Sequence, residues 1–208
     1  MIISTAKQHS DEWHIERARI ITASKFSTIV TAATLKPSAQ IKTVVRLAAA
    51  AKTFNVIDEF FEDYNMARGT ALEPEARAAY SLLTGLDVVE VGLCMNDSQT
   101  AGASPDGLIY SDEELVGGLE IKCPKLNTHL ATLDAGKMPA SHRLQVQGGL
   151  WITGAQWWDF ASYFPGLPMF IERIFPEPEV HAALEKAVQK FTDDLAVMCD
   201  RFKSLGEI

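Results

Sequence analysis

The 208-residue sequence has only three cysteines, no long apolar run and too few basic residues to balance its acidic ones. Cys94, Cys123 and Cys199 are too far apart for a disulfide framework or a close-spaced zinc or iron–sulfur motif. No apolar run approaches the roughly 18 residues of a membrane-spanning helix, so we expect no membrane association. Residues 1–14 lack the apolar core of a secretory signal. The expected location is therefore the reducing cytoplasm.

The sequence is acidic, with 27 Asp and Glu residues against 19 Lys and Arg, a formal charge of −8. This charge argues against a protein that binds nucleic acid through a broad basic surface. It is compatible with an enzyme whose carboxylates hold cations at a phosphodiester. The sequence contains no internal repeat, low-complexity tract or long Gly/Ser linker. These features indicate a single domain over residues 1–208.

Hydrophobic periodicity and turn residues indicate an α/β fold, in which helices flank a central mixed sheet. Helices are expected at residues 9–19 with Ser10 as N-cap, from Thr22 onward, and at 40–51, 69–84, 141–152 and 177–208. Strands are expected at residues 86–93, 107–111, 119–123, 157–163 and 169–175. The C-terminal segment 177–208 is predicted to be amphipathic because its apolar residues recur at steps of three and four.

A β-hairpin is predicted after the Pro-Asp-Gly turn at 105–107, because proline sets φ and glycine permits positive φ. Strand 107–111 is expected to fold back on strand 119–123. The residues expected to form the loop between the two strands are Asp112, Glu113 and Gly117-Gly118. This fold brings Asp106 beside the end of the second strand.

The second strand presents two charged side chains on one face. Because strand side chains alternate between faces, Glu120 and Lys122 point to one side and the apolar residues Leu119 and Ile121 to the other. Together with Asp106 they form a group of two carboxylates and one ammonium. Carboxylate oxygens are the ligands that Mg²⁺ prefers, with water and substrate phosphate completing its shell. The alternative is a plain hairpin that carries a surface ion pair between Glu120 and Lys122.

Several motifs occur in an order typical of one family. They are WHIERARIITAS at 13–24, RG…LE…AR…Y at 68–80, SPDGL at 104–108, LEIKCP at 119–124 and QVQGGLW at 145–151. On these motifs the chain resembles the phage lambda exonuclease and YqaJ-type viral recombinase family, within the PD-(D/E)XK nuclease superfamily. The resemblance spans residues 13–175. It implies a restriction-endonuclease-like fold and a protein of phage or prophage origin acting inside a bacterial cell.

The resemblance assigns roles to the residues of the hairpin and the helix that follows. Asp106 matches the bridging metal ligand, and Glu120 matches the second carboxylate ligand. The carbonyl of Ile121 would complete the metal shell. Lys122 matches the catalytic lysine, and Gln145 matches the residue that helps this lysine hold the attacking water. The implied cofactor is Mg²⁺, with Mn²⁺ expected to substitute.

Three further residues have competing interpretations. Glu73 matches a helix-borne glutamate near a second metal, but it would also suit the first turn of a helix, where the dipole favours a carboxylate. Pro74 beside it departs from the family pattern. Asp97 matches a further acidic residue with a spacing one residue short, and the alternative is an exposed loop aspartate. His142 lies one turn before Gln145, where it would touch substrate or be a surface histidine.

The N-terminal motif implies a second site. Arg17, Ser24 and Ser104 resemble the family's pocket for a 5′-phosphate. A helix that starts near Thr22 would present free N–H groups to an anion, and arginine binds phosphate with two parallel hydrogen bonds. The alternative is that Thr22 or Ser24 only caps a helix and that Arg17 is a surface charge.

The resemblance implies a Mg²⁺-dependent exonuclease that degrades one strand of double-stranded DNA from its 5′ end. The product would be a 3′ overhang for a single-strand annealing protein, and the family's lambda-type members form a toroidal trimer. One alternative is a PD-(D/E)XK endonuclease with a structure or sequence preference. Another is a non-catalytic scaffold that binds DNA ends for an annealing protein.

Overall fold

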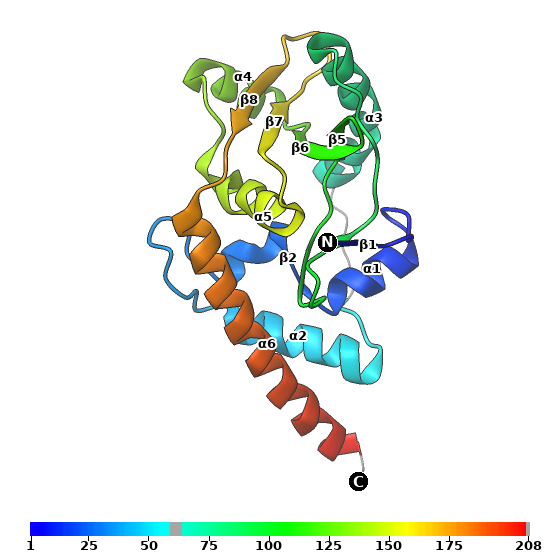
Figure 1. Ribbon diagram of the computed structural model, residues 1–208, viewed down its shortest axis with the longest axis vertical. Helices are drawn as coiled ribbons and strands as arrows, with labels where there is room; N and C mark the ends of the chain where they lie inside the picture. Colours follow the sequence, from blue (N-terminus) through cyan, green and yellow to red (C-terminus); the bar gives the residue numbers. More distant parts are fainter. Residues whose placement is uncertain (59–63, 207–208) are drawn as a thin grey trace.

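The structure is a computed structural model that describes residues 1–58 and 64–206 (Figure 1). Its helices are α1 (Asp11–Ala18), α2 (Ile41–Phe54), α3 (Tyr64–Thr84), α4 (Leu126–Ala135), α5 (Arg143–Thr153) and α6 (Pro178–Gly206), with short 3₁₀ helices η1 (Ala23–Thr28) and η2 (Ala140–His142). Its strands are β1 (Ile2–Ile3), β2 (Ile21–Thr22), β3 (Cys94–Met95), β4 (Ala101–Ala103), β5 (Gly107–Ser111), β6 (Glu114–Lys122), β7 (Trp157–Ser162) and β8 (Phe170–Ile174).

The strands form two mixed sheets. The smaller sheet has the order β1-β3-β4-β2, and the larger has the order β5-β6-β7-β8. In the larger sheet β6 and β7 are parallel, whereas β5 pairs antiparallel with β6 and β8 antiparallel with β7. Helix α5 lies in the connection between the two parallel strands, as such a crossover requires. The predicted α/β architecture with a mixed sheet flanked by helices is confirmed.

Two helices cover opposite faces of the larger sheet. On one face, Ala76 and Tyr80 of α3 pack with Leu119 and Ile121 of β6. On the other face, α5 packs with the buried aromatic rings of β7, and the same core extends to α2 and α6. Glu120 pairs in register with Phe160, so its side chain belongs to the α5 side of the sheet. The alternation of side chains along β6 therefore directs its charged residues away from α3.

Several predicted elements are confirmed. Helix α1 follows Ser10, whose hydroxyl accepts a hydrogen bond from the backbone N–H of Trp13 at 3.2 Å. The C-terminal segment is helical, and the buried members of its apolar stripe are Val180, Leu184, Val188, Phe191 and Leu195. Figure 1 shows α6 lying beside α2 and extending away from the sheets. In the described residues, no helix has the length and apolarity needed to cross a bilayer.

Two strand predictions were wrong. Residues 86–93 form no strand of their own, and only Val89 makes a bridge to Leu108, through a hydrogen bond in each direction. β-branched composition favours an extended chain, but a strand also needs a partner edge, and this segment finds one at a single residue. Gly117-Gly118 lies within β6 rather than in the hairpin loop, which is reduced to Asp112 and Glu113 at positive φ. The glycines are in the strand because the indole rings of β7 pack on them.

Two helix predictions were also wrong in detail. Helix α3 includes the residues from Tyr64 onward, so Pro74 lies inside the helix and not in its first turn. The segment after Thr22 forms the 3₁₀ helix η1, and the Thr22 hydroxyl makes no capping hydrogen bond. The apolar face expected for this segment is present, because Phe26, Ile29 and Val30 are buried in the core.

The packing of β6 against β7 gives a stability prediction. A β-carbon at Gly118 would lie 2.3 Å from ring atoms of Trp158, which is 1% exposed and cannot move aside. Gly118→Ala is therefore expected to lower the free energy of unfolding by about 2 kcal/mol, as overpacking does. Gly69→Ala in α3 is the control, because a β-carbon there meets nothing within 4 Å. It should raise stability by about 0.5–1 kcal/mol. Denaturant unfolding measures both, and equal stabilities would contradict this account.

Candidate active site

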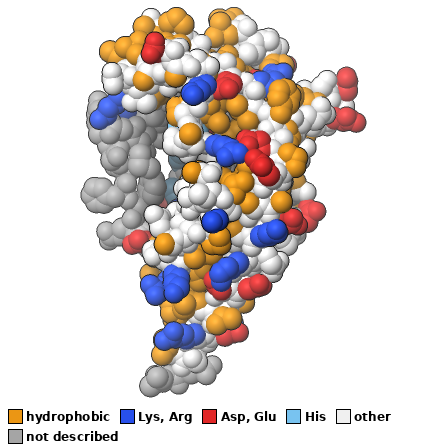
Figure 2. Space-filling view, turned by 90° about the vertical axis from the view of Figure 1, so that its left-hand side faces the viewer, with side chains coloured by type: hydrophobic (Ala, Val, Ile, Leu, Met, Phe, Trp, Pro, Cys, Tyr) orange, Lys and Arg blue, Asp and Glu red, His pale blue; other side chains and the backbone are white. Residues whose placement is uncertain are grey.

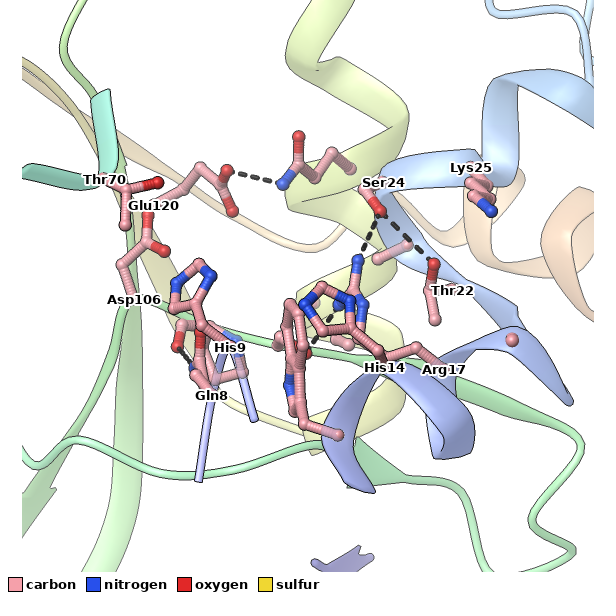
Figure 3. A pocket seen from close by; sticks show the side chains of 18 of the residues that line it. Gln8, His9, His14, Arg17, Thr22, Ser24, Lys25, Thr70, Asp106 and Glu120 are labelled. Carbon is pink, nitrogen blue, oxygen red and sulfur yellow. Dashed lines mark hydrogen bonds between the residues drawn. The ribbon is translucent and has the colours of Figure 1, made fainter. Parts of the chain in front are cut away.

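A cavity of about 620 Å³ lies where the two sheets, α1, α3 and α5 approach one another (Figure 3). Two groups of polar side chains line it. The first comes from the hairpin, α3 and α5 and consists of Glu73, Asp106, Glu120, Lys122 and Gln145. The second comes from α1, η1 and the end of β4 and consists of Arg17, Ser24, Lys25 and Ser104. One continuous cavity thus contains both sites that the sequence predicts separately.

The β5–β6 register positions Asp106. Its backbone N–H donates to the carbonyl of Leu119 at 3.0 Å, directly before the pairing of Gly107 with Leu119. Its carboxylate oxygen Oδ2 accepts a hydrogen bond of 2.5 Å from the backbone N–H of Ile121. The turn is therefore pinned to β6 by main chain and side chain together. This leaves Asp106 beside the two charged residues of that strand.

Glu120 receives two donors on one oxygen. The ammonium of Lys122 and the amide Nε2 of Gln145 each lie 2.5 Å from Glu120 Oε1. Glu120 is 3% exposed, so these contacts replace the water that its carboxylate has lost. Burial disfavours the charge on Lys122, but Glu120 and Asp106 outweigh this effect and raise its pKa to about 12. Lys122 is therefore an ammonium that donates hydrogen bonds. The interpretation of the pair as a surface ion pair is wrong, because Glu120 is buried.

The carboxylates of this group repel one another. Burial, followed by the charge of Glu120, raises the pKa of Asp106 well above its usual value. Burial also raises the pKa of Glu73, although Arg77 and then His9 oppose that rise. A bound cation would relieve the repulsion among these oxygens. These clustered carboxylate oxygens therefore have the charge and donor atoms expected of a divalent-cation site.

The donor set fits a hard cation. Within residues 1–58 and 64–206, no three His, Cys, Asp or Glu side chains are arranged to hold a metal by themselves. Mg²⁺ does not need such a cage, because one or two carboxylates with waters and substrate phosphate are its usual shell. Asp106 and Glu120 supply those carboxylates. The residues present therefore fit Mg²⁺ bound together with a substrate phosphate.

Glu73 reaches the cavity from the middle of α3. Because α3 already includes Tyr64, the interpretation of Glu73 as a first-turn glutamate is wrong. Its Oε1 accepts a hydrogen bond of 2.6 Å from Nη2 of Arg77, one turn further along the helix. Arg77 Nε also donates to the backbone carbonyl of Asp106 at 2.9 Å. Arg77 therefore holds Glu73 and the Asp106 turn together.

Arg17 projects from α1 toward two serines. Its Nη1 donates to Ser104 Oγ at 2.6 Å and its Nη2 to Ser24 Oγ at 3.1 Å. The guanidinium stacks on the Trp13 ring at 4.2 Å, and Trp13 Nε1 also donates to Ser104 Oγ at 3.1 Å. Burial lowers the pKa of Arg17 to about 10, which leaves it charged at neutral pH. Arg17 is thus a fixed cation in the cavity wall, and the interpretation of it as a free surface charge is wrong.

Two predicted residues lie outside the cavity wall. Asp97 occupies the β3–β4 turn, where its side chain is 87% exposed and pairs with the N-terminal amine at 2.7 Å. The spacing that separates it from Asp106 leaves it on the surface. His142 stacks on Phe160 with ring centroids 5.2 Å apart. The residue is partly buried, and burial followed by the nearby Lys122 lowers the pKa of its imidazole to about 4, which favours the neutral form at neutral pH.

Sequence reasoning missed three residues that support the site. The Trp13 ring supports the Arg17 guanidinium, and the only sequence signal for this role was the presence of Trp13 in the N-terminal motif. Arg77 had a signal in its spacing of four residues from Glu73, which suits a helical ion pair. Gln8 had no signal. Its amide donates to the carbonyls of Val91 and Pro105, each at 2.8 Å, and so fastens the chain before α1 to the turn that carries Asp106.

Charge on the surface is mixed. On the face shown in Figure 2, Lys and Arg side chains are interspersed with acidic ones and form no single basic patch. This distribution agrees with the formal charge of −8. The cations that line the cavity are Arg17, Lys25 and Lys122. Arg77, which pairs with Glu73 at 2.6 Å, adds a further positive charge beside the carboxylates.

A mixed sheet with an aspartate turn, a Glu-x-Lys strand and a following helix glutamine defines the PD-(D/E)XK class of nucleases. Residues 12–156, more than half of the chain, match the YqaJ-like viral recombinase domain. The chain therefore belongs to the YqaJ-like viral recombinase family. A comparison with curated protein sequences finds no match.

Solved structures agree with this family. The chain is similar to an alkaline exonuclease, LHK-Exo, from Laribacter hongkongensis, with 32% identity and a TM-score of 0.83 over 95% of this chain and 98% of that one. The complex of LHK-Exo with dAMP matches with a TM-score of 0.82 over the same shares. A phage-related exonuclease from Haemophilus somnus 129PT has 17% identity and a TM-score of 0.66 over 88% and 96% of the two chains, which supports the fold alone. These similarities support a nuclease or recombinase function in a family of metal-dependent enzymes.

The repulsion at Asp106 predicts how stability depends on this residue. A carboxyl group whose pKa is raised by folding destabilises the native state once pH exceeds its unfolded pKa, near 4. In chelator at pH 8, Asp106→Asn should therefore raise the free energy of unfolding by about 1–2 kcal/mol. The gain should disappear as the pH falls below 4, where the Asp106 carboxyl group is protonated in the folded and in the unfolded state. Adding Mg²⁺ should raise the melting temperature of the native protein more than that of the variant. A variant less stable than the native protein at pH 8 in chelator would contradict the argument.

Proposed function

We propose that this protein is a Mg²⁺-dependent exonuclease that degrades one strand of double-stranded DNA in the 5′→3′ direction and leaves a 3′ overhang. The observation behind the proposal is that one cavity holds both the Asp106–Glu120–Lys122 group and the Arg17–serine pocket. The first group suits hydrolysis of a phosphodiester. The second suits a terminal phosphate. A strand end that fills both places would be cut a fixed short distance from its 5′ terminus.

In this proposal Asp106, Glu120 and the carbonyl of Ile121 would hold Mg²⁺, and Glu73 would contribute to a second metal site. When bound, the metal would supply Lewis acidity at the phosphate and make the attacking water more acidic. Lys122 and Gln145, which both donate to Glu120 Oε1, orient the attacking water and stabilise negative charge on the phosphate. Arg77 fixes the position of Glu73 and the Asp106 turn. Mn²⁺ is expected to replace Mg²⁺.

The polarity of the reaction would come from Arg17, Ser24 and Ser104. A guanidinium already oriented by two serines and an indole ring loses little freedom when it binds a phosphate. A 5′-phosphate has more negative charge than a phosphodiester and would bind there preferentially. Each cut creates a new 5′-phosphate, so the same pocket would serve every cycle.

The family resemblance suggests the biological setting. The 3′ overhang would be used by a single-strand annealing protein for recombination, in a bacterial cell that carries the phage or prophage. A homo-oligomer, a toroidal trimer as in lambda-type members, would keep the enzyme on its DNA. Each protomer would consist of a single domain over residues 1–208.

Labelled linear duplex tests the proposed chemistry. Asp106→Ala, Glu120→Ala and Lys122→Ala should each reduce Mg²⁺-dependent release of nucleotides from the 5′ end by about 1,000-fold or more, because each removes a charge that acts on the reacting phosphate. Asp97→Ala is the control, since this exposed aspartate lies outside the cavity, and it should keep native activity. Chelator should abolish release from the native protein. Full activity in any of the three variants would exclude the mechanism.

The same assay separates the alternatives. An end-dependent exonuclease should leave a covalently closed circular duplex intact, whereas a PD-(D/E)XK endonuclease would cut it. A scaffold for an annealing protein would bind linear duplex but release no nucleotide with Mg²⁺. Label released first from the 3′ end would overturn the proposed polarity.

The phosphate pocket gives a separate prediction. Arg17→Ala should remove most of the preference for 5′-phosphorylated over 5′-hydroxyl ends, a loss of about tenfold or more, because charge-assisted hydrogen bonds contribute about 1.5–3 kcal/mol each. Arg19→Ala removes the same charge from a residue that bonds Asn55 outside the cavity, and it should keep the preference. Initial rates on duplexes that differ only in the terminal phosphate measure it. Equal digestion of both ends by the native protein would exclude the pocket.

A further inference from the structure

His9 adopts a backbone conformation that is uncommon for residues with a β-carbon. It lies between β1 and α1 with φ at +68°, in the left-handed region that glycine prefers. For a residue with a β-carbon this conformation costs about 1–2 kcal/mol. Such conformations persist only where the surroundings fix them, and they gather at functional sites.

The neighbours of His9 hold it in place. On one side, the Gln8 amide is bound to the carbonyls of Val91 and Pro105. On the other side, the Ser10 N–H donates to the Lys7 carbonyl at 3.0 Å, and its hydroxyl caps α1. The exposed His9 side chain therefore extends from a fixed backbone.

The His9 ring lies between the two polar groups of the cavity. It lines the cavity and packs against the Trp13 ring, with centroids 5.2 Å apart. The same indole supports the Arg17 guanidinium. Figure 3 shows the His9 imidazole beside Asp106, on the side that leads to Arg17 and His14. A strand end that reached from the Arg17 pocket to the carboxylates would pass this ring.

A DNA strand bound in the cavity would need hydrogen-bond donors in the wall between Arg17 and Asp106. Its charged lining residues include four acids, Asp58, Glu73, Asp106 and Glu120, against three cations, Arg17, Lys25 and Lys122. A DNA strand brings further negative charge, so neutral or cationic N–H groups must face its oxygens. An imidazole ring has at least one N–H in either protonation state. His9 therefore offers a donor in the stretch between Arg17 and Asp106.

We propose that His9 binds the 5′-terminal nucleotide of the DNA strand being cleaved, by donating a ring N–H to an oxygen of the sugar–phosphate between the terminal phosphate at Arg17 and the phosphodiester at Asp106. This inference rests on the proposed function and adds a substrate-binding residue to it. The Trp13 ring orients the imidazole. The cost of the left-handed backbone is offset by placing the donor where the strand passes.

Two substitutions test the proposed contact. His9→Gly removes the imidazole and relieves the backbone. His9→Asn also tolerates positive φ but keeps an N–H donor on a short side chain. The control is Gln99→Gly, which relieves a residue at φ +52° in the β3–β4 turn, outside the cavity wall. The probe is a 5′-phosphorylated thymidine dinucleotide, titrated in Ca²⁺, which also takes oxygen ligands. KM and kcat are measured in parallel with Mg²⁺ and 5′-phosphorylated duplex.

The expected result is that His9→Gly weakens dinucleotide binding and raises KM by about five- to tenfold, with kcat within twofold of native. His9→Asn and Gln99→Gly should bind within twofold of native. Both glycine variants should melt at or above the native temperature. Native affinity in His9→Gly would overturn the inference, as would an asparagine variant that binds as weakly as the glycine variant.

The design separates this inference from the proposed function. Arg17→Ala serves as the reference, because it should weaken binding of the same dinucleotide. If Arg17→Ala weakens binding and His9→Gly does not, only the role of His9 is wrong. If the native protein fails to degrade linear duplex, or Arg17→Ala binds the dinucleotide as the native protein does, the proposed function itself is wrong.

Discussion

The register between the Asp106 turn and β6 is the contact on which the site depends. The hydrogen bonds from Asp106 N–H to Leu119 and from Ile121 N–H to the Asp106 carboxylate fix this register. A slip of one residue would turn Glu120 and Lys122 toward α3 and bring apolar side chains into the cavity. Gly118 makes such a slip costly, because the Trp158 ring lies where any larger side chain would be. The core of the sheet therefore determines where the charges meet.

The site is held together by interactions that work against one another. Burial and mutual repulsion disfavour the charged forms of Asp106 and Glu73, while Lys122 on β6 and Arg77 on α3 oppose that effect. Such an arrangement is an expensive way to stabilise a fold, because buried charges lose hydration that pairing only partly replaces. It is well suited to an enzyme that binds a cation and a phosphate. The cation would offset the repulsion among the carboxylates, and the phosphate would pair with the basic side chains. The buried charges that lower the stability of the fold are thus the same charges that would bind these ligands.

Much of this organisation could be predicted from the sequence, and the failures have physical causes. The hairpin, the alternation along β6 and the amphipathic α6 follow from local pattern, so they were predictable. The 86–93 strand failed because pairing depends on a partner edge and not on composition. Gly117-Gly118 resembled loop residues, although their role is to admit two indole rings from β7. Gln8 binds backbone carbonyls more than 80 residues away, and no short motif encodes such contacts. Trp13 and Arg77 contact Arg17 and Glu73 at a spacing of four residues, but their contacts with Ser104 and the Asp106 carbonyl depend on the tertiary fold.

The Gln8 amide has one more consequence. It links the segment that leads into α1, and hence Arg17, to the carbonyl of Pro105, immediately before Asp106. A carboxamide does not titrate and has no net charge, so neither acidity nor dissolved ions weaken this link appreciably. The distance between Arg17 and Asp106 is therefore maintained in part by an uncharged hydrogen bond. If the proposed reaction occurs, the length of each excised unit should stay constant across conditions that alter how tightly DNA binds.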